Sequence, residues 1–246
     1  MKIAVLGAAG WVGRAILKRL EGRHQIRAFD LGPKSWGADN PWDGGEVIHG
    51  EISDYETVYR VIEGVDAVIH LAVYFGPYET NDDLPFLVNL KGLWNTLESA
   101  RQQGVRRIVH IGSCQVEHPD GTFFTADVRR PDGTLYAVSK RLQEEMCRQF
   151  HDAYGTSLVV LRPCSIVDSR LDLGKGGAKL GPGSWSVSMV CRHDLAEACR
   201  LAVEKEDVGF EVFHMAGATE AEACCNVREA CDVLGLTFQG DLEKYR

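Results

Sequence analysis

The first thirty residues contain the stretch that decides the fold. It begins Met1-Lys-Ile-Ala-Val-Leu-Gly-Ala-Ala-Gly-Trp-Val-Gly13 and ends Gln25-Ile-Arg-Ala-Phe-Asp30. An apolar run at residues 3–6 leads directly into a glycine-rich turn, and apolar residues then recur at helical spacing before a second apolar run. The stretch therefore predicts a strand, a tight turn, a helix and a second strand, which is the opening of an α/β fold.

Three glycines give this unit the pattern of a dinucleotide-binding site. Gly7 permits the tight turn, Gly10 lets the backbone approach a pyrophosphate, and Gly13 allows the helix to pack closely on the strand. We expect the pyrophosphate at the helix N-terminus, beside Trp11 and Val12, where free N–H groups and the helix dipole favour anions.

A carboxylate at the end of the second predicted strand selects the cofactor. Asp30 is placed to accept hydrogen bonds from a ribose 2′-OH and would repel a 2′-phosphate, so it predicts NAD rather than NADP. The glycine spacing is Gly-x-x-Gly-x-x-Gly, and a surface turn without a ligand is the alternative for the glycines alone. The strand before them, the helix after them and Asp30 favour the dinucleotide site.

The composition is that of an ordinary globular protein. A chain of 246 residues with 45% apolar and 25% charged residues can bury one sizeable core. A net charge of −8 disfavours nucleic acid as a partner. No apolar stretch approaches a membrane span and the start lacks the pattern of a signal peptide, so we expect a cytoplasmic protein without a membrane partner.

Eight cysteines are present, none of them in a Cys-x-x-Cys pair. They also form no zinc-like cluster with histidines, so we expect reduced thiols and no metal site.

Strands and helices alternate along the chain, which predicts a Rossmann-type, doubly wound parallel sheet. Further strands are expected at 46–49, 66–72, 107–112 and 158–161, and helices at 54–63, 83–103 and 135–154. We expect residues 1–162 to form the NAD-binding core and residues 163–246 a small substrate-binding lobe of the same compact unit.

The lobe is less regular than the core. We expect a helix at 194–204, a strand at 210–215, a helix at 222–234 and a lightly packed polar tail at 241–246. Residues 168–188 show no clear element and are rich in Gly, Ser and Lys. Such a segment is either a functional loop or lid or a disordered stretch.

Tyr136 and Lys140 are candidates for acid–base chemistry. Their i, i+4 spacing near the start of a predicted helix places both side chains on one face. A nearby ammonium stabilises a phenolate and lowers its pKa, so Tyr136 could take a proton from a substrate hydroxyl while a hydride leaves the same carbon. Lys140 could also bind the nicotinamide ribose. A surface pair is the alternative for this motif taken alone.

Ser113 is the third candidate. It follows the predicted strand at 107–112, at the carboxyl edge where open α/β sheets bind ligands. Its hydroxyl could hold the reacting oxygen near Tyr136; the alternative is a helix-capping or turn serine.

Together these motifs resemble the extended short-chain dehydrogenases/reductases, the NAD-dependent epimerase/dehydratase family. The resemblance spans about the first two-thirds of the chain, and the motifs follow the family's order. They are Gly7, Gly10, Gly13, Asp30, His70-Leu71-Ala72, Asn89, Ser113, Tyr136, Lys140 and Arg162-Pro163. The resemblance implies NAD as the cofactor and a homodimer formed through the helices at 83–103 and 135–154.

The resemblance also implies roles for residues outside the core motifs. Glu51-Ile52 matches the segment that contacts adenine, although the family usually has Asp at the first of these positions. Leu71 and Ala72 would pass under the cofactor and Asn89 would brace the active site. The backbone from Cys164 to Ile166 would meet the nicotinamide carboxamide.

Within the family, the sequence is most similar to uronate dehydrogenases, which oxidise the anomeric hydroxyl of a sugar to a lactone. Cys114-Gln115 stands where those enzymes carry an Asn-His pair that helps to hold the sugar. Tyr74 and Phe75 stand where smaller residues are usual, so we expect a less polar, more aromatic pocket. Arg170 could pair with a substrate carboxylate, and an ordinary loop arginine is the alternative.

We therefore predict an NAD-dependent oxidoreductase acting on a small sugar-like or other secondary alcohol. One alternative is a sugar-nucleotide 4-epimerase or dehydratase that holds NAD tightly. Only about 80 residues follow Arg162, which favours a compact substrate over a sugar nucleotide. The other alternative is a non-catalytic dinucleotide sensor. Such proteins often lose the tyrosine or lysine, and this chain keeps both.

Overall fold

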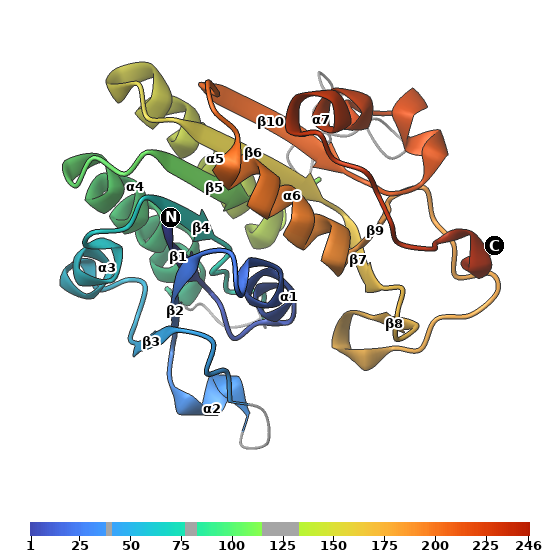
Figure 1. Ribbon diagram of the computed structural model, residues 1–246, viewed down its shortest axis with the longest axis horizontal. Coiled ribbons are helices and arrows are strands. Elements are labelled where there is room, and N and C mark those ends of the chain that lie inside the picture. Colours follow the sequence, from blue (N-terminus) through green and yellow to red (C-terminus); the bar gives the residue numbers. More distant parts are fainter. Residues whose placement is uncertain (38–40, 77–82, 115–132) are drawn as a thin grey trace.

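The computed structural model describes residues 1–37, 41–76, 83–114 and 133–246. Its centre is a seven-stranded sheet with the strand order β10-β6-β5-β4-β1-β2-β3, in which all neighbouring strands are parallel (Figure 1). The strands are β1 (Lys2–Leu6), β2 (Gln25–Asp30), β3 (Glu46–His49), β4 (Ala67–His70), β5 (Arg107–Ile111), β6 (Leu158–Pro163) and β10 (Phe210–Met215). The chain runs outward from β1 to β3 and then crosses over to β4, so the predicted doubly wound Rossmann sheet is confirmed.

Helices cover both faces of the sheet. One face carries α1 (Trp11–Leu20), α6 (Arg192–Glu204) and α7 (Val227–Leu234), and the other carries α3 (Tyr55–Ile62), α4 (Gly92–Gln102) and α5 (Leu135–Tyr154) (Figure 1). Successive residues of β1 serve opposite cores: Ile3 and Val5 pack toward α1, while Ala4 and Leu6 pack toward α3 and α4. Burial on both faces explains why the strands read as continuous apolar runs.

The two predicted regions of the chain share this sheet. Strand β10 pairs with β6, and Leu195 and Phe213 lie in the same core as Ile3. A second, three-stranded sheet has the order β8-β7-β9 and lies outside the main sheet. Its strands are β7 (Ser165–Asp168), β8 (Leu173–Gly174) and β9 (Met189–Cys191). The remaining short elements are α2 (Pro33–Trp36), η2 (Lys175–Gly177), η3 (Thr219–Ala223) and η4 (Glu243–Tyr245).

Two predicted helices are interrupted. The helix expected at 83–103 contains a π-helical segment, η1 (Phe86–Lys91), before α4 begins. The helix expected at 222–234 is instead the 3₁₀ turn η3 followed by α7. Apolar periodicity did not reveal either interruption, because one extra or missing residue per turn changes the spacing too little over so few turns.

The C-terminal tail packs against the loop after β7. Leu242 and Tyr245 are buried in a cluster with Val167 and Met189, and the Tyr245 hydroxyl donates to an Asp172 carboxylate oxygen at 2.8 Å. The expectation of a lightly packed tail is therefore wrong, since its two apolar side chains complete a small core. Within the described residues, the helices include none with the length and apolar content of a membrane span.

Candidate active site

The glycine turn after β1 is shaped by close backbone contacts. Gly7 has a φ of +92°, and a Cβ at this position would lie 2.7 Å from the amide nitrogen of Ala72. A Cβ on Gly13 would lie 2.5 Å from the carbonyl oxygens of both Gly7 and Ala8. Glycine is therefore required at both positions, first for the turn and then for the packing of α1 against β1.

The same turn presents polar groups that suit a dinucleotide. Asp30 Oδ2 accepts from the Ala9 N–H at 2.8 Å and Oδ1 accepts from the Leu31 N–H at 2.9 Å, so its carboxylate is oriented by the backbone. The N-cap of α1 is Gly10, and the first turn of this helix has no acidic residue. Its free N–H groups are thus open to an anion, while the Asp30 carboxylate can accept from ribose hydroxyls. These residues fit NAD.

The segment predicted to meet adenine lies beside Asp30. The Gly50 N–H donates to the Asp30 carbonyl at 3.1 Å, and Glu51 next to it is exposed. Ile52 is buried, and its carbonyl accepts from Asn95 Nδ2 at 2.8 Å. The structure thus brings Glu51 and Ile52 to the predicted end of the cofactor site, and their contact with adenine stays a prediction.

Ser113, Tyr136 and Lys140 come together at the carboxyl end of β5. The Ser113 side chain shares a hydrogen bond with the Tyr136 hydroxyl. Lys140 Nζ donates to the carbonyl of Ile111, the last residue of β5, at 3.0 Å. Ser113 and Lys140 are buried and Tyr136 is partly buried. Ser113 follows β5 while the other two residues lie in the first turns of α5, so packing of α5 on the sheet assembles this group.

Burial dominates the electrostatics of this group. It lowers the pKa of Lys140 to about 7, because the ammonium has lost its water. Burial also raises the pKa of Tyr136, and the hydrogen bond from Ser113 lowers it by a smaller amount. The predicted lowering of the Tyr136 pKa by Lys140 is therefore wrong for this structure. The ammonium is directed at the Ile111 carbonyl, and Ser113 is the neighbour that stabilises the phenolate.

Asn89 connects the loop after β4 with α5. Its Oδ1 accepts from the Tyr74 N–H at 2.7 Å, and its Nδ2 donates to the Ser139 hydroxyl at 3.1 Å. Gln143 Nε2 donates to the Asn89 carbonyl at 2.7 Å, within the π-helical segment η1. The side chain is fully buried. Asn89 thus has the geometry of a brace, and π segments are frequent at functional sites.

An aromatic side chain covers the phenol. The Phe75 and Tyr136 rings lie edge to face with centroids 4.7 Å apart, and Lys175 Nζ from η2 lies over the Phe75 ring. Phe75 is 53% exposed, so it forms a wall rather than part of the core. Tyr74 contributes through its backbone contact with Asn89.

Of the remaining predicted site residues, the two cysteines lie beside Tyr136 and Arg170 lies elsewhere. Cys114 and Cys164 lie beside Tyr136, and negative charge on these sulfurs would oppose its ionisation. The Ile166 N–H donates to the Cys164 carbonyl at 3.1 Å, and Leu71 continues β4 through its N–H bond to Leu6. Arg170 instead lines a cavity of about 430 Å³ with Lys18, Arg19, His193, Glu197 and other residues of α1, α6 and the C-terminal segment. Gln115 lies outside the described residues.

Two contacts near the site had no local signal in the sequence. Arg192 lies over the Trp11 ring, donates to the Trp11 carbonyl at 3.0 Å and pairs with buried Asp168, so it ties α6 to the start of α1. His70 and His110 are paired in register on β4 and β5 with their Nδ1 atoms 3.1 Å apart. Burial lowers the pKa of both rings, that of His70 to about 3, so both are neutral at physiological pH.

The fold and this site define the class of protein, a Rossmann-type protein of the extended short-chain dehydrogenase/reductase group. Residues 3–175 match the sequence model described as the NAD dependent epimerase/dehydratase family. The chain belongs to this family, and the prediction of NAD as the cofactor is confirmed. No cluster of three or more His, Cys, Asp or Glu side chains suited to a metal ion occurs in the described part of the chain.

Relatives with assigned names include two uronate dehydrogenases. The one from Pseudomonas putida is 32% identical over 170 residues, covering 65% of this chain and 59% of the relative. The one from Pseudomonas syringae pv. tomato is 29% identical over 167 residues, covering 65% and 58%. The matched part of the chain thus spans less than two thirds of the full length of these relatives.

Solved structures share the fold over nearly the whole chain. Uronate dehydrogenase from Agrobacterium tumefaciens superposes with a TM-score of 0.76 at 25% identity, covering 98% of this chain and 85% of the other. A short-chain dehydrogenase/reductase superfamily protein with bound NAD, also from Agrobacterium tumefaciens, gives a TM-score of 0.82 at 20% identity. That match covers 100% of this chain and 94% of the other.

Proposed function

We propose that this protein is an NAD-dependent dehydrogenase that oxidises the hydroxyl group of a small, sugar-like alcohol, as its uronate dehydrogenase relatives are named for doing. The observation that carries the proposal is the convergence of Ser113, Tyr136 and Lys140 at the carboxyl edge of the sheet. This edge also holds the glycine turn at Gly7 and the carboxylate of Asp30.

Tyr136 acts as the general base in this proposal. Its phenolate takes the proton of the substrate hydroxyl, and the Ser113 hydroxyl donates a hydrogen bond to the same substrate oxygen. Bound NAD supplies the hydride acceptor. Because burial opposes the phenolate, the hydrogen bond from Ser113 stabilises it until the substrate binds, and the single Ser113 hydroxyl proton then turns to the substrate oxygen. The buried Lys140, with a pKa of about 7, can hold or release a proton near neutral pH behind Tyr136.

The cofactor would be held mainly by backbone groups. The turn from Gly7 to Gly13 would bind the pyrophosphate through the N-terminus of α1, and Asp30 would accept from the adenine ribose. The further residues proposed to contact NAD are Trp11, Val12, Glu51, Ile52, Leu71, Ala72, Asn89, Cys164 and Ile166.

The substrate would lie between the phenol and the loop after β4. Phe75 covers Tyr136 and Cys114 lies beside it, so the proposed pocket has an aromatic and sulfur-lined wall, to which we add Tyr74 from its sequence position next to Phe75. Such a wall favours a less polar substrate than a free uronate. The proposed contact of Gln115 rests on its sequence position, and that of Arg170 is not supported by the cavity that it lines.

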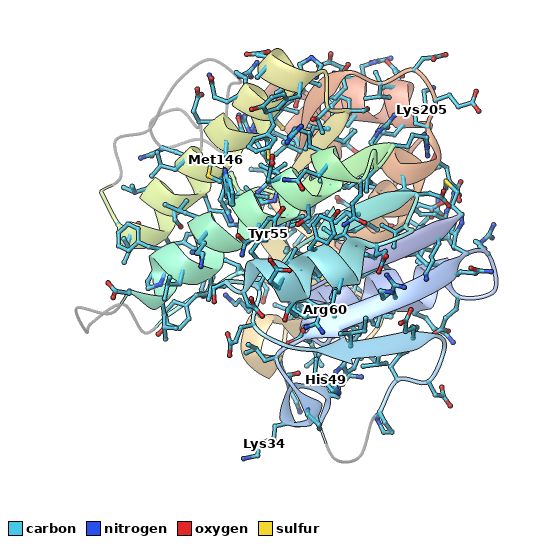
Figure 2. All side chains as sticks on the ribbon, turned by 90° about the vertical axis from the view of Figure 1, so that its left-hand side faces the viewer. Lys34, His49, Tyr55, Arg60, Met146 and Lys205 are labelled. Carbon is cyan, nitrogen blue, oxygen red and sulfur yellow. The ribbon has the colours of Figure 1, made fainter. Side chains whose placement is uncertain are left out.

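We further propose a homodimer formed by the outer faces of η1, α4 and α5. Figure 2 looks onto this side of the molecule, where Tyr55 on α3 and Met146 on α5 are labelled. Five large side chains of these elements are exposed, namely Phe86, Leu87, Trp94, Leu142 and, at the end of α5, Tyr154. An apolar set of this kind on neighbouring helices suits a helix–helix interface, and sedimentation velocity at micromolar concentration measures it.

The cytoplasm is the proposed location. All eight cysteines are free thiols, and the cytoplasm keeps thiols reduced.

A substrate panel tests the proposed function. Uronates, aldoses and simple secondary alcohols are each incubated with the protein and excess NAD⁺, and the absorbance of reduced nicotinamide is followed. We expect steady NADH production with at least one of them, and a much lower rate with Tyr136→Phe. Isomerisation of a sugar nucleotide without net NADH would overturn the proposal in favour of an epimerase, and NAD binding without turnover of any compound would favour a sensor.

A further inference from the structure

Two cysteines stand opposite each other where β5 and β6 end. Every register pair of these strands joins residues fifty positions apart, from Ile108 with Leu158 to Ile111 with Leu161. The register continues past the strand ends, because the N–H of Gly112 donates to the Leu161 carbonyl at 2.8 Å and that of Cys114 donates to the Pro163 carbonyl at 3.2 Å. The same spacing sets Cys114 directly opposite Cys164.

This placement suits a covalent link between the two sulfurs. Neighbouring strands lie about 4.8 Å apart, and disulfides join residues whose Cα atoms are about 4.4–6.8 Å apart. Residues in register point their side chains to the same face of a sheet. The two thiols already share a hydrogen bond, with Cys114 S–H as the donor to the Cys164 sulfur. The spacing of paired strands is therefore compatible with bond formation between them.

The two thiols differ in exposure and in acidity. Cys114 is 7% exposed and packs with apolar residues of the C-terminal region, and its pKa is raised by the hydrogen bond that it donates and by burial. Cys164 is exposed. The hydrogen bonds from Cys114, Ser188 and Ser165 lower the pKa of Cys164 to about 7. Cys164 is thus the accessible nucleophile, and Cys114 is the thiol behind it.

We propose that Cys164 and Cys114 form a reversible disulfide when the protein meets a hydroperoxide, with Cys164 oxidised first. The Cys164 thiolate attacks a peroxide oxygen and the O–O bond breaks. Cys164 becomes a sulfenic acid, and the leaving oxygen takes a proton. The Cys114 sulfur then attacks the Cys164 sulfur, the S–O bond breaks, and the hydroxide leaves as water with the Cys114 proton. The two thiols lose two electrons, which reduce hydrogen peroxide to two waters.

The disulfide would act on the site already described. Ser113 directly precedes Cys114 and shares the hydrogen bond with Tyr136, so a bond at Cys114 constrains the group that stabilises the phenolate. The inference goes beyond the proposed function, because sulfur oxidation needs no turnover. A disulfide near the surface is also open to attack by a reducing thiol, which makes the change reversible.

The first experiment maps the bond. The full chain is treated with hydrogen peroxide, remaining thiols are alkylated, and the digest is analysed by mass spectrometry before and after dithiothreitol. We expect one reducible peptide pair linking Cys114 and Cys164. Cys164→Ser abolishes it, and Cys114→Ser leaves a sulfenic acid at Cys164 that dimedone traps. Cys231→Ser is the matched control and keeps the link, since Cys231 is a partly exposed thiol whose pKa is raised by burial.

The second experiment measures reactivity without peroxide. Alkylation of Cys164 by iodoacetamide should reach half its maximal rate near pH 7, and that of Cys231 only at a pH above the ordinary range of a thiol, because burial raises its pKa. At pH 7 we expect Cys164 to react at least about threefold faster than Cys231, the ratio for an unperturbed thiol after allowing for the weaker nucleophilicity of the more acidic one. Links between other cysteines, or a Cys164 no more reactive than Cys231, would overturn the inference.

The two proposals fail separately. If the link forms while no alcohol is oxidised with NAD, the dehydrogenase proposal fails and the disulfide stands. If the protein produces NADH and peroxide leaves both thiols free, the disulfide proposal fails and the dehydrogenase proposal stands.

Discussion

The glycine turn after β1 and the Ser113–Tyr136–Lys140 group lie at the same edge of the sheet but are built differently. The turn comes from thirty consecutive residues and acts through backbone groups, with Asp30 held by the N–H of Ala9. The second group comes from separate segments and acts through side chains whose properties depend on burial. A local sequence pattern is therefore sufficient for the first site, whereas the chemistry of the second depends on how the elements pack.

The largest expected effect falls on the side-chain group. Tyr136→Phe should reduce turnover by about 10²–10⁴-fold, because it removes proton transfer in the transition state. NAD affinity should change little, since the turn is untouched. NADH production and an NAD titration measure the two quantities. Tyr154→Phe is the control, because that phenol is exposed at the far end of the same helix. Unchanged turnover in Tyr136→Phe would remove Tyr136 from the mechanism.

The next largest effect is expected in the glycine turn after β1. Gly7→Ala forces a positive φ on alanine and drives its Cβ to 2.7 Å from the Ala72 nitrogen. We expect a loss of stability of a few kcal/mol and NAD binding weakened at least tenfold. Gly22→Ala is a matched control, because Gly22 also has a positive φ but its Cβ would meet nothing within 4 Å. Denaturant unfolding and NAD titration compare them, and equal losses in both variants would contradict the prediction.

A smaller effect on NAD binding is expected from Asp30, whose carboxylate accepts from the glycine turn. Asp30→Ala removes the acceptor for Ala9 and Leu31 and for a ribose hydroxyl. Hydrogen bonds to charged groups contribute about 1.5–3 kcal/mol, so NAD binding should weaken about 10- to 100-fold. Discrimination against NADP should also relax. Asp66→Ala is the control, as that carboxylate accepts from the Lys2 N–H at the start of β1. If the unmodified protein prefers NADP, our interpretation of Asp30 is wrong.

The smallest effect is a pH dependence of stability that belongs to Lys140. Its pKa is about 7 in the folded protein, against about 10.4 for an exposed lysine. Between these values the unfolded chain holds a proton that the folded protein has released, so the free energy of unfolding rises with pH. From pH 7 to about 8.5 the rise due to Lys140 is on the order of 1 kcal/mol.

Denaturant unfolding across this pH range measures the rise. Lys140→Met should lack it, because methionine fills the buried site without a titrating group. Lys205→Met is the control, since Lys205 is exposed after α6 (labelled in Figure 2). The prediction fails if Lys140→Met follows the same pH slope as the unmodified protein.

The regular elements of the fold were largely predictable from periodicity. The bounds of α5 and β10 agree with those expected at 135–154 and 210–215. The π segment η1 was missed because an apolar stripe tolerates one extra residue in a turn. The packing of Tyr245 was missed because its partner Asp172 lies 73 positions away in the sequence. The interrupted and distant features are the ones that local spacing does not encode.

What the sequence determined by itself is the turn of Gly7, Gly10 and Gly13, the acid at Asp30 and the residue types available for proton transfer. These follow from backbone dihedral angles and side-chain chemistry, which are local. The tertiary structure decided the pKa directions of Tyr136 and Lys140 and the pairing of Cys114 with Cys164. Burial and strand register control these properties, and both exist only when segments far apart in the chain pack together.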